Sequence, residues 1–191
     1  MSLRITKPAF NVREKINELE GIVSYDRMPQ GSVIQVVQGR LTNQTESSAG
    51  VNVDVDIGLY AYISPRYRTS KILVTLDSLP IRMRGASTSV HFLLQRRIGS
   101  EQQSGQANSY TWLNHVATAE YSGVMTPADT YNFEYYPGLN YLDSPGTTEL
   151  VGYRIIGNKN SGSGGVAYNH NAGGGRGAHN YATLTLMEIK Q

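Results

Sequence analysis

The side chains that could perform chemistry in this sequence are few. The four histidines are His91, His115, His170 and His179, and no pair has the H-x-x-x-H spacing. The chain contains no cysteine, so it lacks thiolate ligands and thiol nucleophiles. A protein zinc site needs clustered ligands, and neither a cysteine nor a nearby acid completes such a set with these histidines. We therefore expect ordinary surface or packed histidines, with no metal and no cofactor. The alternative is a metal site on a symmetry axis, formed by histidines from several copies of the chain.

Two carboxylates, Asp54 and Asp56, are the best candidates for acid–base chemistry or calcium binding. They alternate with apolar residues in the segment 51–63, where Val51, Val53, Val55, Ile57 and Leu59 would point toward a core. On such a half-buried strand the aspartates occupy the solvent face, where charges discourage aggregation. We expect this solvated role, because no G-x-S-x-G elbow or phosphate-binding glycine loop accompanies them. No residue is assigned a catalytic role, and the protein is expected not to be an enzyme.

The most distinctive local feature is the glycine-rich segment 157–177, which carries eight glycines in twenty-one positions. So many glycines disfavour a strand or helix interior, so we expect a loop that begins where a strand stops at Gly157. It could be a flexible surface connection, an exposed tip that recognises a glycan or protein, or a lattice contact with neighbouring subunits. The residues that would make such recognition or lattice contacts are Asn158, Asn160, Tyr168, Asn169, His170, Asn171 and Arg176.

Composition narrows the class of protein. The net charge is +2, too small to indicate nucleic acid or an anionic membrane as a partner. No apolar run is long enough to span a bilayer, and the first ten residues do not read as a signal peptide. Thirteen tyrosines against three phenylalanines suit either a sheet face or an interface between chains. We expect synthesis in a cytoplasm without secretion.

The elements that must position these residues are mostly strands. Short apolar or alternating segments occur at 33–38, 51–63, 71–79, 87–97, 149–156 and 181–189, and 110–121 reads as one or two more. A polar loop is expected at 41–50, and turn-rich residues join 71–79 to 87–97. The pattern predicts an all-β fold, an antiparallel β-sandwich or jelly roll, occupying residues 31–191.

One helix precedes this domain. Asn11 and Glu14 have the spacing of a capping box, and Gly21 follows as a C-terminal cap. A helix of roughly two and a half turns is unstable alone in water, so its apolar face must dock on something. We predict that residues 1–30 form an extended arm and short α-helix for attachment or oligomerisation. The apolar anchors would be Ile5, Pro8, Phe10, Val12, Ile16 and Leu19.

Several segments together resemble structural proteins of tailed phages, including phages of marine and freshwater bacteria such as cyanophages. ITKPAFNVREKINELE (5–20) is similar to an N-terminal segment of such proteins. Pieces of a widespread phage β domain are similar to MPQGSVIQVVQ (28–38), SKILVTLDSL (70–79), YLDSPGTTELVGYRI (141–155) and YATLTLMEI (181–189). The long glycine-rich segment departs from that group. No matching piece is a catalytic signature.

The resemblance implies a non-enzymatic virion structural protein, made in the bacterial host cytoplasm. It would be a small homotrimeric, tail-associated fibre or spike, anchored by its N-terminal segment on a tail adaptor or baseplate. Its β head would contact a host surface glycan or protein. The alternative is a capsid decoration protein, a cement or head fibre, that binds the major capsid protein. Other hypotheses are a glycan-degrading spike, which would need a carboxylate cluster in a groove, and a lectin-like module.

Overall fold

The computed structural model describes residues 24–77, 79–84, 89–99, 111–112, 117–119, 132–135, 138–170 and 182–191. The predicted N-terminal arm and helix therefore lie outside the described residues, apart from a short 3-10 turn, η1 (Tyr25–Arg27). All other described elements are strands: β1 (Val33–Leu41), β2 (Thr45–Ser47), β3 (Asp54–Ile63), β4 (Lys71–Asp77), β5 (Ile81–Arg84), β6 (Ser89–Ile98), β7 (Thr111–Trp112), β8 (Ala117–Ala119), β9 (Asn132–Tyr135), β10 (Leu139–Asp143), β11 (Val151–Ser161), β12 (Val166–Tyr168) and β13 (Ala182–Ile189). The predicted all-β class is confirmed for this part of the chain.

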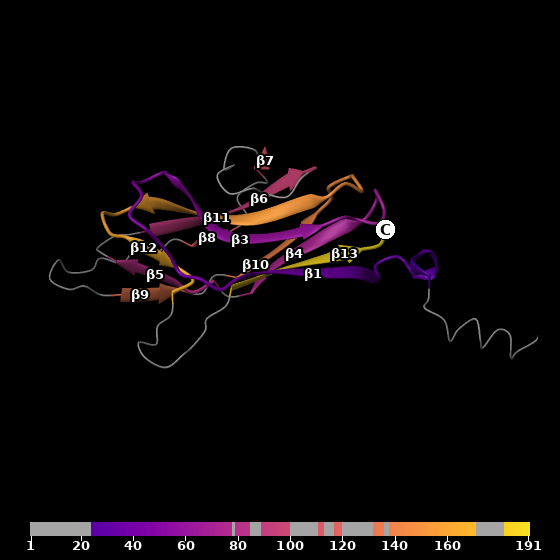
Figure 1. Ribbon diagram of the computed structural model, residues 1–191, viewed down its shortest axis with the longest axis horizontal. Helices are drawn as coiled ribbons and strands as arrows, with labels where there is room; N and C mark the ends of the chain where they lie inside the picture. The colour runs from indigo at the N-terminus through magenta and orange to yellow at the C-terminus, as the bar shows by residue number, and fades with distance from the viewer. Residues whose placement is uncertain are drawn as a thin grey trace, which may run out of the picture.

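Two larger antiparallel sheets lie against each other (Figure 1). One has the strand order β1-β13-β4-β10, and the other has the order β3-β11-β6-β7, with β8 also paired to β6. Apolar side chains from both sheets form one buried cluster, which includes Leu59, Val74, Phe92, Ile155 and Leu184. Successive side chains of a strand point to opposite faces of its sheet, so residues at every second position face this core.

The chain alternates between the two sheets as it proceeds. β1, β4, β10 and β13 belong to the first sheet, whereas β3, β6 and β11 belong to the second. The connections between the sheets carry four further strands, which form a third sheet of order β2-β12-β5-β9. Figure 1 shows this third sheet at one end of the molecule, with η1 at the other end. The molecule therefore has two structurally different poles.

The backbones of the two large sheets come close together where β1 passes β3. A Cβ atom at Gly39 of β1 would lie 1.6 Å from the backbone oxygen of Tyr60 in β3. No side chain fits at that distance, so glycine is the residue that lets the two backbones touch.

Two expectations about strands are wrong. The polar loop predicted at 41–50 contains the strand β2, which is only three residues long. The strand predicted from residue 51 begins at Asp54, and Val51 and Val53 are 45% and 47% exposed instead of facing the core. A left-handed residue, Asn52 (φ 62°), precedes the strand. From Val55 onward the alternation holds: Val55 packs against the core, and Ile57 and Leu59 are buried as expected, on either side of a register shift at Gly58 (φ 83°).

The prediction for the glycine-rich segment is also wrong in its first half. The strand does not stop at Gly157: β11 continues to Ser161 and pairs with both β3 and β6. After a turn at Gly162 (φ 87°), β12 joins the third sheet. Residues 171–181 lie outside the described residues.

Candidate functional site

The side chains predicted for attachment or recognition are distributed unevenly over the described structure. Asn171 and Arg176 lie outside the described residues, as do all six N-terminal anchors, Ile5, Pro8, Phe10, Val12, Ile16 and Leu19. The remaining five predicted recognition residues are described, and they separate into an accessible pair on β11 and a buried group on and after β12.

The accessible pair comprises Asn158, which is half-buried, and Asn160, which is exposed. The Asn158 side-chain amide donates to Asp54 Oδ1 at 2.7 Å across to the neighbouring strand β3. This contact keeps the Asp54 carboxylate at the sheet surface, in agreement with its predicted solvated position. A contact role for these two asparagines stays a prediction.

The buried group starts with Tyr168, whose side chain is 1% exposed. Its ring lies over Gly157, where a Cβ atom would come within 2.3 Å of the ring, and it packs edge-to-face on Phe92 at 6.2 Å between centroids. Burial raises the pKa of the Tyr168 hydroxyl well above its ordinary value. Tyr168 is therefore a packing residue that joins β12 to β11 and β6, and it offers no surface to a ligand.

Asn169 and His170 continue the buried group. Asn169 adopts a left-handed conformation (φ 53°), and its amide donates to the carbonyls of Leu41 at 3.0 Å and Asn43 at 3.1 Å. The His170 ring nitrogens lie 2.9 Å from Gln44 Oε1 and 3.2 Å from an Arg82 guanidinium nitrogen. These contacts attach the end of β12 to the connection between β1 and β2 and to β5. The two side chains are buried and hold the third sheet in place.

The paired aspartates do not form an acid–base site. Asp54 and Asp56 share one face of β3 as predicted, but Asp56 Oδ2 forms an ion pair with Arg154 at 3.2 Å. Arg154 is 1% exposed and also donates to Gln95 Oε1 at 2.8 Å. A buried guanidinium needs such partners, because an unpaired buried charge is strongly destabilising. Within the described ranges, no three His, Asp or Glu side chains cluster closely enough to hold a metal ion.

A second buried polar cluster lies between the two large sheets. Asp143 accepts from Arg96 at 2.8 Å and from the Tyr153 hydroxyl at 2.7 Å. Burial, together with the Asp143 charge, raises the pKa of the Tyr153 hydroxyl far above its ordinary range. No local pattern in the sequence indicates this cluster, because its partners come from three separate strands, β6, β10 and β11. It is a structural cross-link between the sheets.

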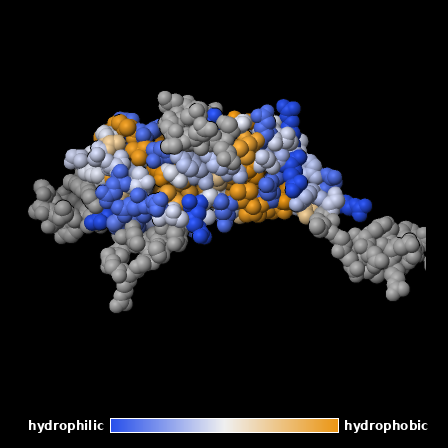
Figure 2. Space-filling view, in the orientation of Figure 1, coloured by the Kyte–Doolittle hydropathy of each residue, from blue (hydrophilic) through white to orange (hydrophobic). Residues whose placement is uncertain are grey.

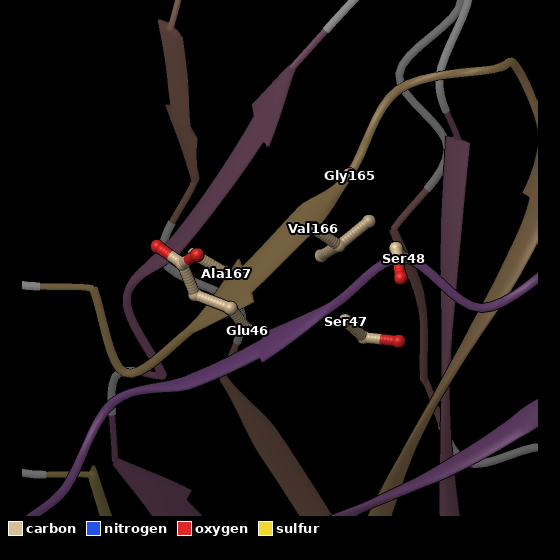
Figure 3. Close-up of a pocket in the computed structure, with 6 residues that line it drawn as sticks. All are labelled: Glu46, Ser47, Ser48, Gly165, Val166 and Ala167. Atoms are coloured by element: carbon tan, nitrogen blue, oxygen red, sulfur yellow. The ribbon is translucent and has the colours of Figure 1, made fainter.

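A pocket of about 200 Å³ opens on the third sheet between β2 and β12. Its lining residues are Glu46, Ser47, Ser48, Gly165, Val166 and Ala167. Figure 3 shows the Glu46 carboxylate at one end of this group and the hydroxyls of Ser47 and Ser48 at the other. Glu46 already accepts from the Gln44 amide at 2.8 Å, and Ser47 Oγ accepts from the backbone N–H of Ala49 at 3.1 Å. No nucleophile and base converge among these lining residues, so the pocket does not have the geometry of a hydrolytic site.

The most organised polar site lies at the pole that carries η1, and we call it the base clasp. It consists of Tyr25, Asp26, Arg66, Tyr67, Glu188 and Lys190, with the backbone of residues 25–28. The Lys190 ammonium donates to three main-chain carbonyls, those of Tyr25 (3.0 Å), Asp26 (2.7 Å) and Met28 (2.7 Å). A cation that binds the last carbonyls of a helical turn satisfies acceptors that the turn leaves open.

Side chains from the connection after β3 complete the base clasp. The Tyr67 hydroxyl donates to Asp26, and this hydrogen bond is the largest cause of the raised pKa of Tyr67. The Arg66 guanidinium lies over the Tyr25 ring, 4.0 Å from its centroid. The backbone N–H groups of Arg66 and Tyr67 in turn donate to Glu188, which is fully buried. The clasp therefore ties residues 25–28 to β13 and to the connection after β3.

Beside the base clasp, backbone hydrogen bonds join the residues just before β1 to Lys190. The backbone N–H of Gly31 donates to the Lys190 carbonyl at 2.8 Å, and the Lys190 N–H donates to Ser32 O at 3.0 Å. The first described residues thus pair with the last ones at the pole opposite the third sheet (Figure 1). The sequence offers no local pattern for this site, because the partners of residue 26 are about 40 and 160 residues away.

No family model matches the sequence, and no curated protein matches it either. Among solved structures, a chain of the infectious bursal disease virus Gt strain is similar with a TM-score of 0.38 and 13% identity, over 90% of this chain and 42% of that one. A chain of the Gx strain of the same virus gives a TM-score of 0.33 and 14% identity, over 82% of this chain and 37% of that one. The VP2 subviral particle of this virus gives a TM-score of 0.32 and 13% identity, over 84% of this chain and 38% of that one.

This chain spans about two fifths of the length of those viral chains. All three TM-scores are below 0.5, so these likenesses establish no role for this chain. No helix among the described residues is both long and apolar enough to cross a membrane.

Proposed function

We propose that this chain is a non-enzymatic virion structural protein, attached to the particle by its N-terminal segment and projecting a jelly-roll head. The observation that carries the proposal is that the molecule has two different ends. Residue 24 enters at the base clasp, and the third sheet lies at the opposite pole (Figure 1). An attached protein needs this separation, because its anchor and its outward surface must not compete for space.

The architecture supports a jelly roll specifically. Successive strands alternate between two layers, the four-stranded sheet β1-β13-β4-β10 and the five-stranded sheet β3-β11-β6-β7 with β8, and the crossings on one side carry the small third sheet. This strand order is that of two Greek keys wrapped into a double sheet. Jelly rolls serve many functions, so the fold alone is consistent with a virion role without requiring it. The similarity of segments such as ITKPAFNVREKINELE (5–20) to tailed-phage structural proteins supplies the remaining support.

Within this proposal, a small trimeric tail fibre or spike that contacts the host surface is our preferred form. A capsid decoration protein is the alternative. Quantitative mass spectrometry of purified particles separates the two, since tail-associated proteins are present in at most a few dozen copies and decoration proteins in hundreds. A count in the hundreds would exclude the tail fibre and favour the capsid decoration protein. Light scattering tests the trimer, and a folded monomer at micromolar concentration would exclude it.

The virion role itself is tested by the attachment residues. Replacing Ile5 and Phe10 together by aspartate is expected to leave the circular dichroism spectrum of the head unchanged and to remove the protein from particles. The matched control is the replacement of Val51 and Val53 by aspartate, because both are exposed apolar residues of the head. Equal incorporation of both variants would contradict attachment through the N-terminal segment.

A further inference from the structure

The outer face of the sheet β1-β13-β4-β10 carries an apolar row that crosses all four strands. The cross-strand register places Val36 beside Met187, Met187 beside Leu73, and Leu73 beside Leu142. Val36 is 56% and Leu142 is 48% exposed, and the two residues between them are half-buried. Another apolar pair, Val33 and Ile189, is adjacent on the side of the base clasp. We call these six residues the apolar row.

The neighbouring positions on the same face are polar. Two positions away from the row on each strand, on the side away from the base clasp, the register aligns Gln38, Thr185, Thr75 and Asn140. The Gln38 amide donates to Thr185 Oγ1 at 3.0 Å, although Thr185 itself is only 7% exposed. The apolar row is therefore confined to the half of the sheet next to the base clasp. Figure 2 shows hydrophobic side chains gathered over the region where β1, β13 and β4 run.

We propose that the apolar row is the docking site for residues 11–20 of the same chain, which pack on it through Val12, Ile16 and Leu19. The sequence predicts an amphipathic helix for these residues, which needs an apolar surface to be stable. The inference refines the proposed function. It divides the attachment segment into a helix folded back on the head and a free anchor that contains Ile5, Pro8 and Phe10.

The dimensions of the two partners agree. Strands in a sheet lie about 4.8 Å apart, so a row across four strands is about 14 Å long. A helix of ten residues is about 15 Å long. The helix would therefore lie across the strands and cover the row from β1 to β10.

The connection is also short enough to favour the same chain. Only residues 21–23 separate the predicted helix from Ser24, and four Cα-to-Cα steps reach about 14 Å at most. Tyr25, the next residue, is held by the Lys190 ammonium at 3.0 Å, and Lys190 directly follows Ile189 of the apolar row. The base clasp therefore places Tyr25, and with it the connection to residues 11–20, next to the edge of the apolar row.

The size of the row argues against a second copy as its occupant. Six side chains that are half-exposed or less accessible offer apolar surface on the order of a few hundred Å². A stable protein–protein interface buries roughly 800 Å² on each partner. One face of a short helix matches the smaller area, whereas a second head packed on this sheet would need a larger apolar surface.

Disulfide trapping tests the proposal directly, because the native chain contains no cysteine. The double variant Ile16→Cys with Leu73→Cys is oxidised in the purified full-length protein. We expect an intrachain disulfide in most molecules, seen as a faster-migrating monomer and confirmed by peptide mass. Two matched controls should cross-link at least tenfold less. The first pairs Ile16→Cys with Asp77→Cys, four residues further along β4, and the second pairs Glu18→Cys on the opposite helix face with Leu73→Cys.

Three results would overturn the proposal. Equal cross-linking of the test and control pairs would mean that residues 11–20 have no fixed position on the head. A disulfide found only between chains would assign the row to a neighbour's segment. Dimers formed by Leu73→Cys alone would assign it to a second head. Circular dichroism of every variant excludes unfolding as the cause. Because the test uses isolated protein, its failure leaves the particle-incorporation test of the proposed function intact.

Discussion

The contact between β1 and β3 at Gly39 gives a quantitative test of how the two large sheets close on each other. In Gly39→Ala the new Cβ atom would lie 1.6 Å from Tyr60 O, 2.6 Å from the Tyr60 carbonyl carbon and 3.1 Å from Ala61 Cβ. A carbon and an oxygen need a separation of more than 3 Å, so one backbone must move by about 1.5 Å. Overpacking of a core typically costs about 1–3 kcal/mol. Because rigid backbone is displaced here, we expect a loss of about 3–5 kcal/mol.

For a chain of this length, 1 kcal/mol corresponds to roughly 2–4 °C, so the midpoint of thermal unfolding should fall by about 10 °C. Circular dichroism melting together with urea unfolding measures both quantities. The control is Gly50→Ala, whose Cβ atom would be 3.8 Å from the nearest atom, Val53 Cγ2. The control should change stability by less than about 1 kcal/mol. If Gly39→Ala melts within 2 °C of the wild type, the close approach of β1 to β3 is wrong.

Three further perturbations probe the other contacts. Gly157→Ala places a methyl group against the Tyr168 ring and should cost about 2–4 kcal/mol in urea unfolding; an unchanged midpoint would refute that packing. The raised pKa of Tyr153 means that the folded state binds its proton more tightly, so stability is fully present below about pH 10 and falls as the pH rises above it. Tyr153→Phe should make this alkaline fall shallower, by up to about 1.4 kcal/mol per pH unit, and a slope equal to that of the wild type would contradict the assignment. Lys190→Met should speed amide hydrogen exchange in residues 25–28 by about tenfold, with little change in the melting temperature of the whole protein. Unchanged exchange would contradict the contacts of the base clasp.

Much of the double sheet follows from periodicity in the sequence. β4 and β6 were expected within about two residues of their observed ends, because alternating apolar residues at a period of two report a half-buried strand. The same rule misplaced Val51 and Val53, since the left-handed residue Asn52 lies between them and β3 begins only at Asp54. Periodicity describes a strand only as far as its backbone is regular.

The third sheet and the base clasp could not be predicted, for a different reason. β2 and β12 are three residues long, too short to show a period, and they exist because the connections between the large sheets pair with one another. Gly157 looked like a strand terminator, yet it is required where a tyrosine eleven residues later covers the backbone. Lys190 binds carbonyls more than 160 residues away. Each of these features is a long-range contact with no local signature.

Incorporation into particles tests the central claim most directly. Phage particles would be produced with either the full-length protein or a version lacking residues 1–23, and the protein would be quantified in both by mass spectrometry after density purification. We predict that the full-length chain is present at a fixed copy number and that the shortened chain, still folded by circular dichroism, is absent. Absence of the full-length chain from purified particles would contradict a virion role. Equal incorporation of the two versions would contradict attachment through the N-terminal segment.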